Sequence, residues 1–221
     1  MAIDKSRTSV GVKVVLVLVA LAMVSYLVPT LFGLFGSNGN TTSDSTSPND
    51  VLAQIAQKYT ATTQAFDAAL ESDPTSYTVL VNQGNAYFDW GMDVVQAAST
   101  NQALQGSEQP MWLSARTYYE KALQIQQEPA VSVDLSITYF YSGETTKAIA
   151  IASSVTTSQP EFAPAWFNLG VFHAAQGNNP AAIVAFEKSI ALDPNGQSTN
   201  KDYATQQLAA LKGSSPTTTS P

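Results

Sequence analysis

The residues that could carry out chemistry in this chain are few, and they form no catalytic or metal-binding pattern. His173 is the only histidine, and a partly buried core residue is a better interpretation of it than a catalytic base or a metal ligand. Asp67, Glu71 and Asp73 cluster near a helix end but lack the spacing of a calcium loop. No serine sits in a nucleophile elbow, and the glycines form no phosphate-binding motif. We therefore predict that the protein is not an enzyme and has no cofactor and no metal site.

The composition argues against two further classes of site or partner. The 221 residues carry a net charge of -7, whereas a nucleic-acid-binding protein needs clustered Lys and Arg to neutralise phosphates. There is no cysteine, so disulfides and thiolate metal sites are impossible. The sequence thus predicts no nucleic-acid partner, and it leaves a protein or peptide as the expected partner.

An apolar run near the N-terminus predicts a membrane anchor at residues 14–35, preceded by a short basic segment at 1–13. A helix of that length spans about 33 Å, enough to cross the hydrocarbon core of a bilayer. The next basic residue after the run is Lys58, so the basic segment is expected to stay in the cytoplasm and the rest to lie outside the cell membrane. A cleaved signal peptide is the alternative, but the run is longer than a usual signal sequence and no clear cleavage site follows.

The chain beyond the anchor divides by composition into a linker, a folded part and a tail. Residues 36–49 are rich in Ser, Thr, Asn and Gly, a composition typical of a flexible linker. Residues 213–221 have a similar composition and are expected to form a disordered tail. Residues 50–212 carry the apolar periodicity of helices, so we expect one folded region there.

A spacing of small and large residues returns along the folded part. Ala182, Phe186, Ser189 and Pro194 show it, and Pro160 lies 34 residues before Pro194. The pattern predicts an all-α fold of stacked helix pairs. It divides the folded region into a half-repeat (50–74), a repeat with an insertion at about 92–110 (75–128), two further repeats (129–160 and 161–194) and a capping helix (200–212).

These motifs resemble the tetratricopeptide repeat (TPR) family. The family pattern W-x2-L-G-x2-Y, followed by A-x3-F and a late Pro, is similar to Trp166-x2-Leu169-Gly170-x2-His173, Ala182-x3-Phe186 and Pro194 in this chain. The resemblance implies a TPR-type α-solenoid of antiparallel helix pairs, here preceded by one transmembrane helix.

The spacing also predicts how the helices pack. Gly84 and Gly170 should let the two helices of a pair approach closely, while Tyr119 and Phe186 fill the remaining space. In the half-repeat, Thr62 is expected to take the place of the small residue.

The resemblance further implies a concave groove, lined by the first helix of each pair, in which family members bind peptide segments. The family's carboxylate-binding slots hold Val81, Val133 and Phe167 here, so a charged clamp for a C-terminus is not expected. For Phe140 and Phe167, packing between neighbouring repeats is the alternative. The candidate groove residues are Asn82, Asn85, Phe88, Asp89, Val133, Ile137, Phe140, Tyr141, Phe167, Asn168 and Val171.

These features favour a bacterial, single-pass membrane protein whose TPR domain lies outside the cytoplasm and acts as a scaffold or adaptor for a protein or peptide partner. Membrane-tethered repeats of this kind also resemble assembly factors for c-type cytochromes. A chaperone-like helper at the secretion channel is another alternative. A fourth possibility is a structural role in which the protein self-associates through the exposed segment 104–112 of the insertion.

Overall fold

A computed structural model describes residues 47–213, and this part of the chain is helical. The predicted cytoplasmic segment, the anchor and most of the linker and tail lie outside the described residues. Among the residues described, no helix is both long and apolar enough to cross a membrane. The elements are α2 (Pro48–Ser72), α3 (Tyr77–Thr100), the 3-10 turn η1 (Gln102–Leu104), α4 (Gln109–Ile125), α5 (Pro129–Tyr141), α6 (Thr145–Ser158), α7 (Ala163–Ala175), α8 (Asn179–Leu192) and α9 (Lys201–Gly213).

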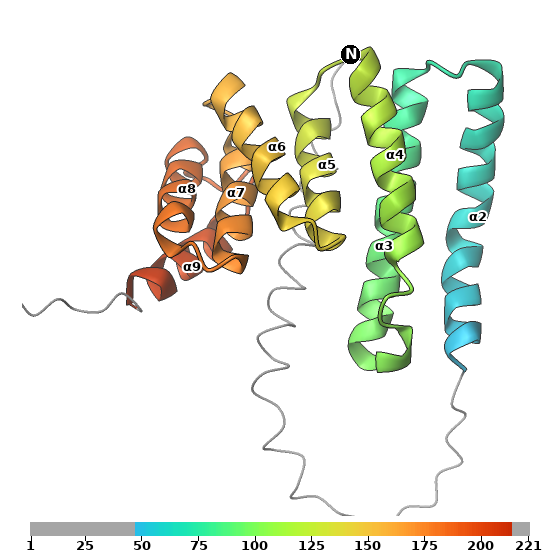
Figure 1. The fold of residues 1–221 in the computed structure, drawn as a ribbon, viewed down its shortest axis with the longest axis horizontal. Coiled ribbons are helices and arrows are strands. Elements are labelled where there is room, and N and C mark those ends of the chain that lie inside the picture. Colours follow the sequence, from blue (N-terminus) through green and yellow to red (C-terminus); the bar gives the residue numbers. More distant parts are fainter. Residues whose placement is uncertain (1–46, 214–221) are drawn as a thin grey trace, which may run out of the picture.

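The helices form a row of antiparallel pairs, α3 with α4, α5 with α6 and α7 with α8 (Figure 1). α2 packs on α3 at one end of the row, and α9 packs on α8 at the other. Tight turns join the helices of the two later pairs, where Gly143 and Gly177 have positive φ values of 81° and 77°. Glycine adopts this backbone conformation without strain. The described chain is therefore an all-α helix-pair solenoid.

Glycines allow close contact within two of the pairs, which confirms the predicted packing. A Cβ atom added to Gly84 would lie 2.6 Å from the ring of Tyr119, and one added to Gly170 would lie 2.7 Å from the ring of Phe186. Both rings are almost fully buried. Since real Cβ atoms do not approach other atoms so closely, each ring fits only where the facing residue has no side chain.

The half-repeat buries Thr63 in place of the predicted Thr62. Thr62 is exposed, whereas its neighbour Thr63 is buried together with Tyr59. The Thr63 hydroxyl donates to the carbonyl oxygens of Tyr59 and Thr60, at 3.2 and 3.1 Å. Its own carbonyl accepts a hydrogen bond from the Gln83 side chain on α3. The prediction for Thr62 was wrong because the side of α2 that meets α3 carries Thr63 rather than Thr62.

The first pair is longer than the others because α3 continues to Thr100, through most of the segment expected to be an insertion. Along this extension Val94, Leu104 and Trp112 are almost fully buried. Gly91 makes room for the indole of Trp112, since an added Cβ would lie 2.6 Å from that ring. The added residues therefore lengthen the helical pair and are anchored to it by Trp112.

A buried carboxylate joins α9 to the last pair. Asp193 follows α8 and accepts hydrogen bonds from the backbone N–H groups of Gln197, Ser198 and Thr199 at 2.7–2.9 Å. The hydroxyls of Ser198 and Thr199 donate to the same carboxylate at 3.0 Å. Burial alone would raise the pKa of Asp193, but these hydrogen bonds outweigh burial and lower it to about 2. The loop is thus fixed in the conformation that directs the chain into α9.

Candidate functional site

The structure separates the candidate groove residues into a buried and an accessible group. Asn82, Asn85, Phe140 and Tyr141 are half-buried, and Asp89 is exposed. The other side chains are covered by neighbouring helices and cannot contact a partner in this conformation. These buried residues are Phe88, Val133, Ile137, Phe167, Asn168 and Val171.

Packing between elements explains the buried group and corrects the expectation of an open aromatic groove. The ring of Phe167 lies 6.0 Å from Tyr203 of α9 and 6.2 Å from Phe186 of α8, measured between ring centroids. The ring of Phe88 lies 5.5 Å from Trp112. Phe167 therefore packs as a core residue between its own repeat and the capping helix α9.

Phe140 also packs between repeats, although it keeps some exposed surface. Its ring stacks on Phe172 of the next pair with centroids 4.9 Å apart and meets Tyr141 edge-on at 5.8 Å. Aromatic contacts of this kind add stability beyond the burial of area. Phe140 thus helps to hold α5 against α7.

The accessible residues of α3 lie on one side of that helix. Asn82, Asn85 and Asp89 follow one another at three- and four-residue steps, which places them in a row along the surface. The Tyr119 hydroxyl on α4 donates a hydrogen bond of 2.8 Å to the Asn85 side-chain oxygen. This bond holds the Asn85 amide in place and leaves its NH2 group as a further donor.

Asp134 on α5 belongs to the same surface, and the sequence reasoning missed it. Its side chain is half-buried. Burial raises the pKa of Asp134 to about 7, and the negative charge of nearby Asp89 acts in the same direction. The available signal was that Asp134 is the only charged residue in an otherwise apolar and hydroxyl-bearing helix. Its neighbour Asp89 is far away in sequence, so no spacing rule linked the two carboxylates.

Tyr141 lies two helical turns after Asp134 on α5. Its ring stacks on Trp112 with centroids 5.3 Å apart, and its hydroxyl oxygen is buried without a hydrogen-bond partner within residues 47–213. Seven residues of α-helix return to the same side after a rise of about 10.5 Å. We call the surface formed by Asn82, Asn85, Asp89, Asp134 and Tyr141 the first-helix face, because all five lie on the first helix of a pair.

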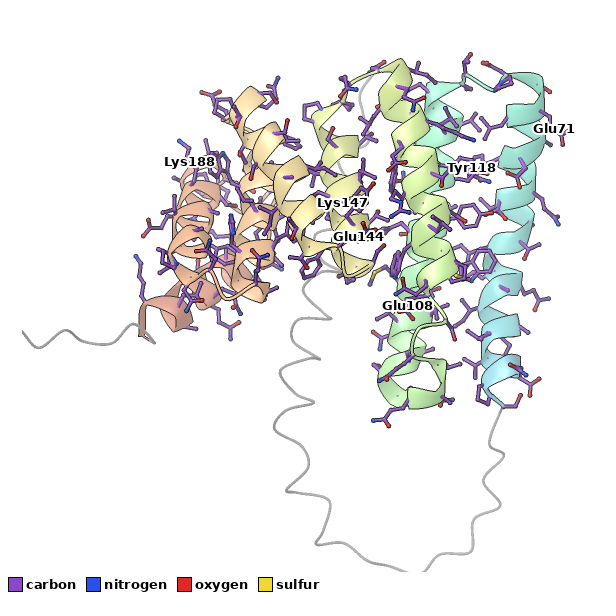
Figure 2. All side chains as sticks on the ribbon, in the orientation of Figure 1. Glu71, Glu108, Tyr118, Glu144, Lys147 and Lys188 are labelled. Carbon is purple, nitrogen blue, oxygen red and sulfur yellow. The ribbon has the colours of Figure 1, made fainter. Side chains whose placement is uncertain are left out.

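The first-helix face carries two acidic side chains, Asp89 and Asp134, and the second is only partly ionised at neutral pH because its pKa is about 7. α3, α5 and α7 contain neither Lys nor Arg, and the cations of the described chain lie on other elements. Arg116 and Lys147, for example, both pair with Glu144 near the start of α6, where Figure 2 labels Glu144 and Lys147. Any cation that pairs with Asp89 or Asp134 therefore comes from another element.

The described residues bring together no group of three or more His, Cys, Asp or Glu side chains that could hold a metal ion. His173 is half-buried on α7, and burial lowers its pKa. What the first-helix face offers to a partner is amide groups and two carboxyl groups on α3 and α5, whereas the Tyr141 hydroxyl is buried. This set of groups can bind a polar segment by hydrogen bonds and charge.

Comparison with known proteins shows which folds this chain resembles. Residues 163–195 match the family model for the tetratricopeptide repeat, which corresponds to the third helix pair. Two crystal structures of MamA each match with 18% sequence identity and a TM-score of 0.51. They cover 74% and 79% of this chain and 94% and 96% of their own.

A third structure is described as the first TPR of Spaghetti (RPAP3) bound to an HSP90 peptide. It matches with 18% identity and a TM-score of 0.48, over 64% of this chain and 94% of its own. No curated protein matches the chain.

Proposed function

Because the third helix pair is a tetratricopeptide repeat within a TPR-type solenoid, we propose that the protein is a membrane-tethered scaffold that binds a protein or peptide partner on its first-helix face. The observation that carries this proposal is the row of accessible polar side chains on α3, Asn82, Asn85 and Asp89, beside the carboxylate of Asp134. Helix-pair solenoids present extended surfaces of this kind, and binding is their usual use.

The membrane tether is part of the same proposal and is supported by the sequence. The apolar run at 14–35 is long enough to span a bilayer, and the basic residues before it favour a cytoplasmic N-terminus. A linker of residues 36–49 can extend by at most about 50 Å. The first-helix face would then be held close to the outer surface of the cell membrane, where it could retain a partner.

A charge reversal on the first-helix face tests the binding role. We expect affinity purification of full-length Asp89→Lys from detergent extracts, followed by quantitative mass spectrometry, to lose at least one protein that the parent retains. Glu71→Lys is the matched control, because Glu71 is also an exposed acid and lies at the far end of α2 (Figure 2). Partner sets that are identical for the parent and for Asp89→Lys would count against this face as the binding surface.

A further inference from the structure

The loop between α8 and α9 contains an asparagine that is placed for a spontaneous covalent change. Asn195 is exposed, its side chain makes no hydrogen bond within residues 47–213, and the next residue is Gly196. We propose that Asn195 is a self-modification site, at which the side-chain amide is converted to aspartate or isoaspartate when the loop opens, and that this change releases the capping helix α9. The inference goes beyond the proposed binding role and does not depend on it.

The reaction needs only water and hydroxide. The backbone nitrogen of Gly196 loses its proton to hydroxide and attacks the side-chain carbonyl carbon of Asn195, so that a C–N bond forms. The side-chain nitrogen takes up a proton from water and leaves as ammonia, which gives a five-membered succinimide ring. Water then adds to one of the two ring carbonyls and opens the ring to aspartate or isoaspartate. The net change is the exchange of ammonia for water.

The glycine makes this asparagine more reactive than most others in the chain, because it has no side chain to hinder the attack. Asn-Gly occurs at only one other place in the sequence, Asn38–Gly39. The loop also requires glycine at position 196, since its φ is +65° and an added Cβ would lie 3.1 Å from the Cβ of Lys201. The backbone conformation that leads into α9 therefore brings the reactive Asn-Gly pair with it.

The folded loop keeps the attacking nitrogen occupied. The Gly196 N–H donates a hydrogen bond of 3.1 Å to the carbonyl oxygen of Asp193. The Asp193 carboxylate in turn accepts hydrogen bonds from the next three backbone N–H groups, those of residues 197–199, at 2.7–2.9 Å. The Gly196 nitrogen must leave its hydrogen bond before it can reach the Asn195 side chain. The reaction thus proceeds from an open state of the loop, and its rate reports how often the loop opens.

The products would prevent the loop from closing again. Isoaspartate carries the main chain through the former side chain and adds one methylene group between Asp193 and the N–H groups that it binds. Either product also places a new negative charge two residues from the Asp193 carboxylate. α9 depends on this loop, and its Tyr203 covers Phe167 with ring centroids 6.0 Å apart. The modification should therefore release α9 and expose the end of the solenoid, which a capping helix normally covers.

The rates of deamidation at two sites of one chain test the inference. Full-length protein in non-ionic detergent would be incubated at mildly alkaline pH, digested after increasing times and analysed by mass spectrometry, with isoaspartate separated from aspartate by elution. Asn38–Gly39, in the segment predicted to be a linker, is the internal reference. We expect Asn195 to react about tenfold or more slowly than Asn38 in the folded protein, because only the open loop is reactive. In denaturing urea the two sites should react at similar rates.

A variant assigns the protection to the loop. Asp193→Ala removes the carboxylate that orders the loop and should accelerate the deamidation of Asn195 by about tenfold, with no change at Asn38. Glu161→Ala, which removes an exposed acid between α6 and α7, is the matched control and should leave both rates unchanged.

Hydrogen exchange tests the release of α9. After the same incubation, the backbone amides of α9 should exchange faster in the parent than before incubation. Asn195→Gln should keep its slow exchange, because a glutamine side chain does not readily form the five-membered ring.

Three results would overturn the inference. Asn195 could react as fast as Asn38 in the folded parent, which would show that the loop does not restrain the Gly196 nitrogen. Asn195 could remain unmodified even in urea, which would show that it is not a modification site. Unchanged exchange of α9 in protein that is fully modified at Asn195 would show that the change does not release the helix.

Discussion

Single residues decide how the helices of this solenoid approach one another. Gly170 on α7 faces the ring of Phe186 on α8, and the space for a side chain is taken by that ring. Gly84 and Tyr119 repeat the arrangement in the first pair. In both helix pairs, the distance between the two helices is set by the volume of the ring that packs against the glycine. A larger side chain at either glycine must therefore displace the neighbouring helix.

Replacing Gly170 by Leu tests this packing. We expect a loss of about 1–3 kcal/mol in the free energy of unfolding, because the new side chain overpacks the contact with Phe186. Chemical denaturation followed by circular dichroism provides the measurement. Ala175→Leu is the control, since Ala175 lies on the same helix with an exposed side chain. If the Gly170 variant unfolds at the same denaturant concentration as the parent, the helices do not make the contact described.

The sequence was most informative where packing is local to a pair. The spacing of Gly170 and Phe186 predicted their contact, because small and large residues at those positions have one favourable arrangement. The repeat spacing gave a wrong prediction for Thr62, because the packing there depends on which side of α2 meets α3. Asp134 could not be linked to Asp89 either, since their proximity depends on how two pairs stack.

At the scale of elements, the position of α9 depends on the loop that follows α8. Asp193 orders this loop through hydrogen bonds to successive backbone N–H groups, and α9 then places Tyr203 against Phe167. Phe167 was expected to line a groove, with packing as the alternative, and it is covered by Phe186 of its own repeat and by Tyr203 of α9. The length of α3 has a similar cause, since its extension is stabilised by Trp112 of α4.

The Asp193 loop predicts a dependence of stability on pH. The pKa of Asp193 is lowered to about 2 in the folded protein, while an unfolded Asp titrates near 3.9. Ionised Asp193 therefore stabilises the fold above about pH 4, and this contribution is lost as the pH falls toward 2.

We expect Asp193→Asn to lower the free energy of unfolding by about 2 kcal/mol at pH 7, with a smaller difference from the parent at pH 3. Urea unfolding at both pH values measures this. A difference that stays constant between pH 7 and pH 3 would show that the ionised carboxylate is not responsible.

For the whole molecule, we propose that the row of helix pairs lies at the outer side of a membrane and is held there by an N-terminal anchor. The chain has no cysteine, so single cysteines can report which side of the membrane a residue occupies. We expect Gln124→Cys, at an exposed position of α4, to react with a membrane-impermeant maleimide in intact cells. Ser6→Cys, in the segment predicted to be cytoplasmic, should react only after permeabilisation. Labelling of Gln124→Cys only after permeabilisation would place the helix pairs on the other side.

The central claim is that a partner docks on the first-helix face, and site-specific photo-crosslinking in native membranes tests it most directly. A photoreactive amino acid would be placed at Asp89, on this face, and in a second variant at Gln124, an exposed position on α4, the second helix of the first pair. The account predicts a discrete crosslinked species with another protein from position 89 and none from position 124. Crosslinks from position 124 with none from position 89 would contradict it.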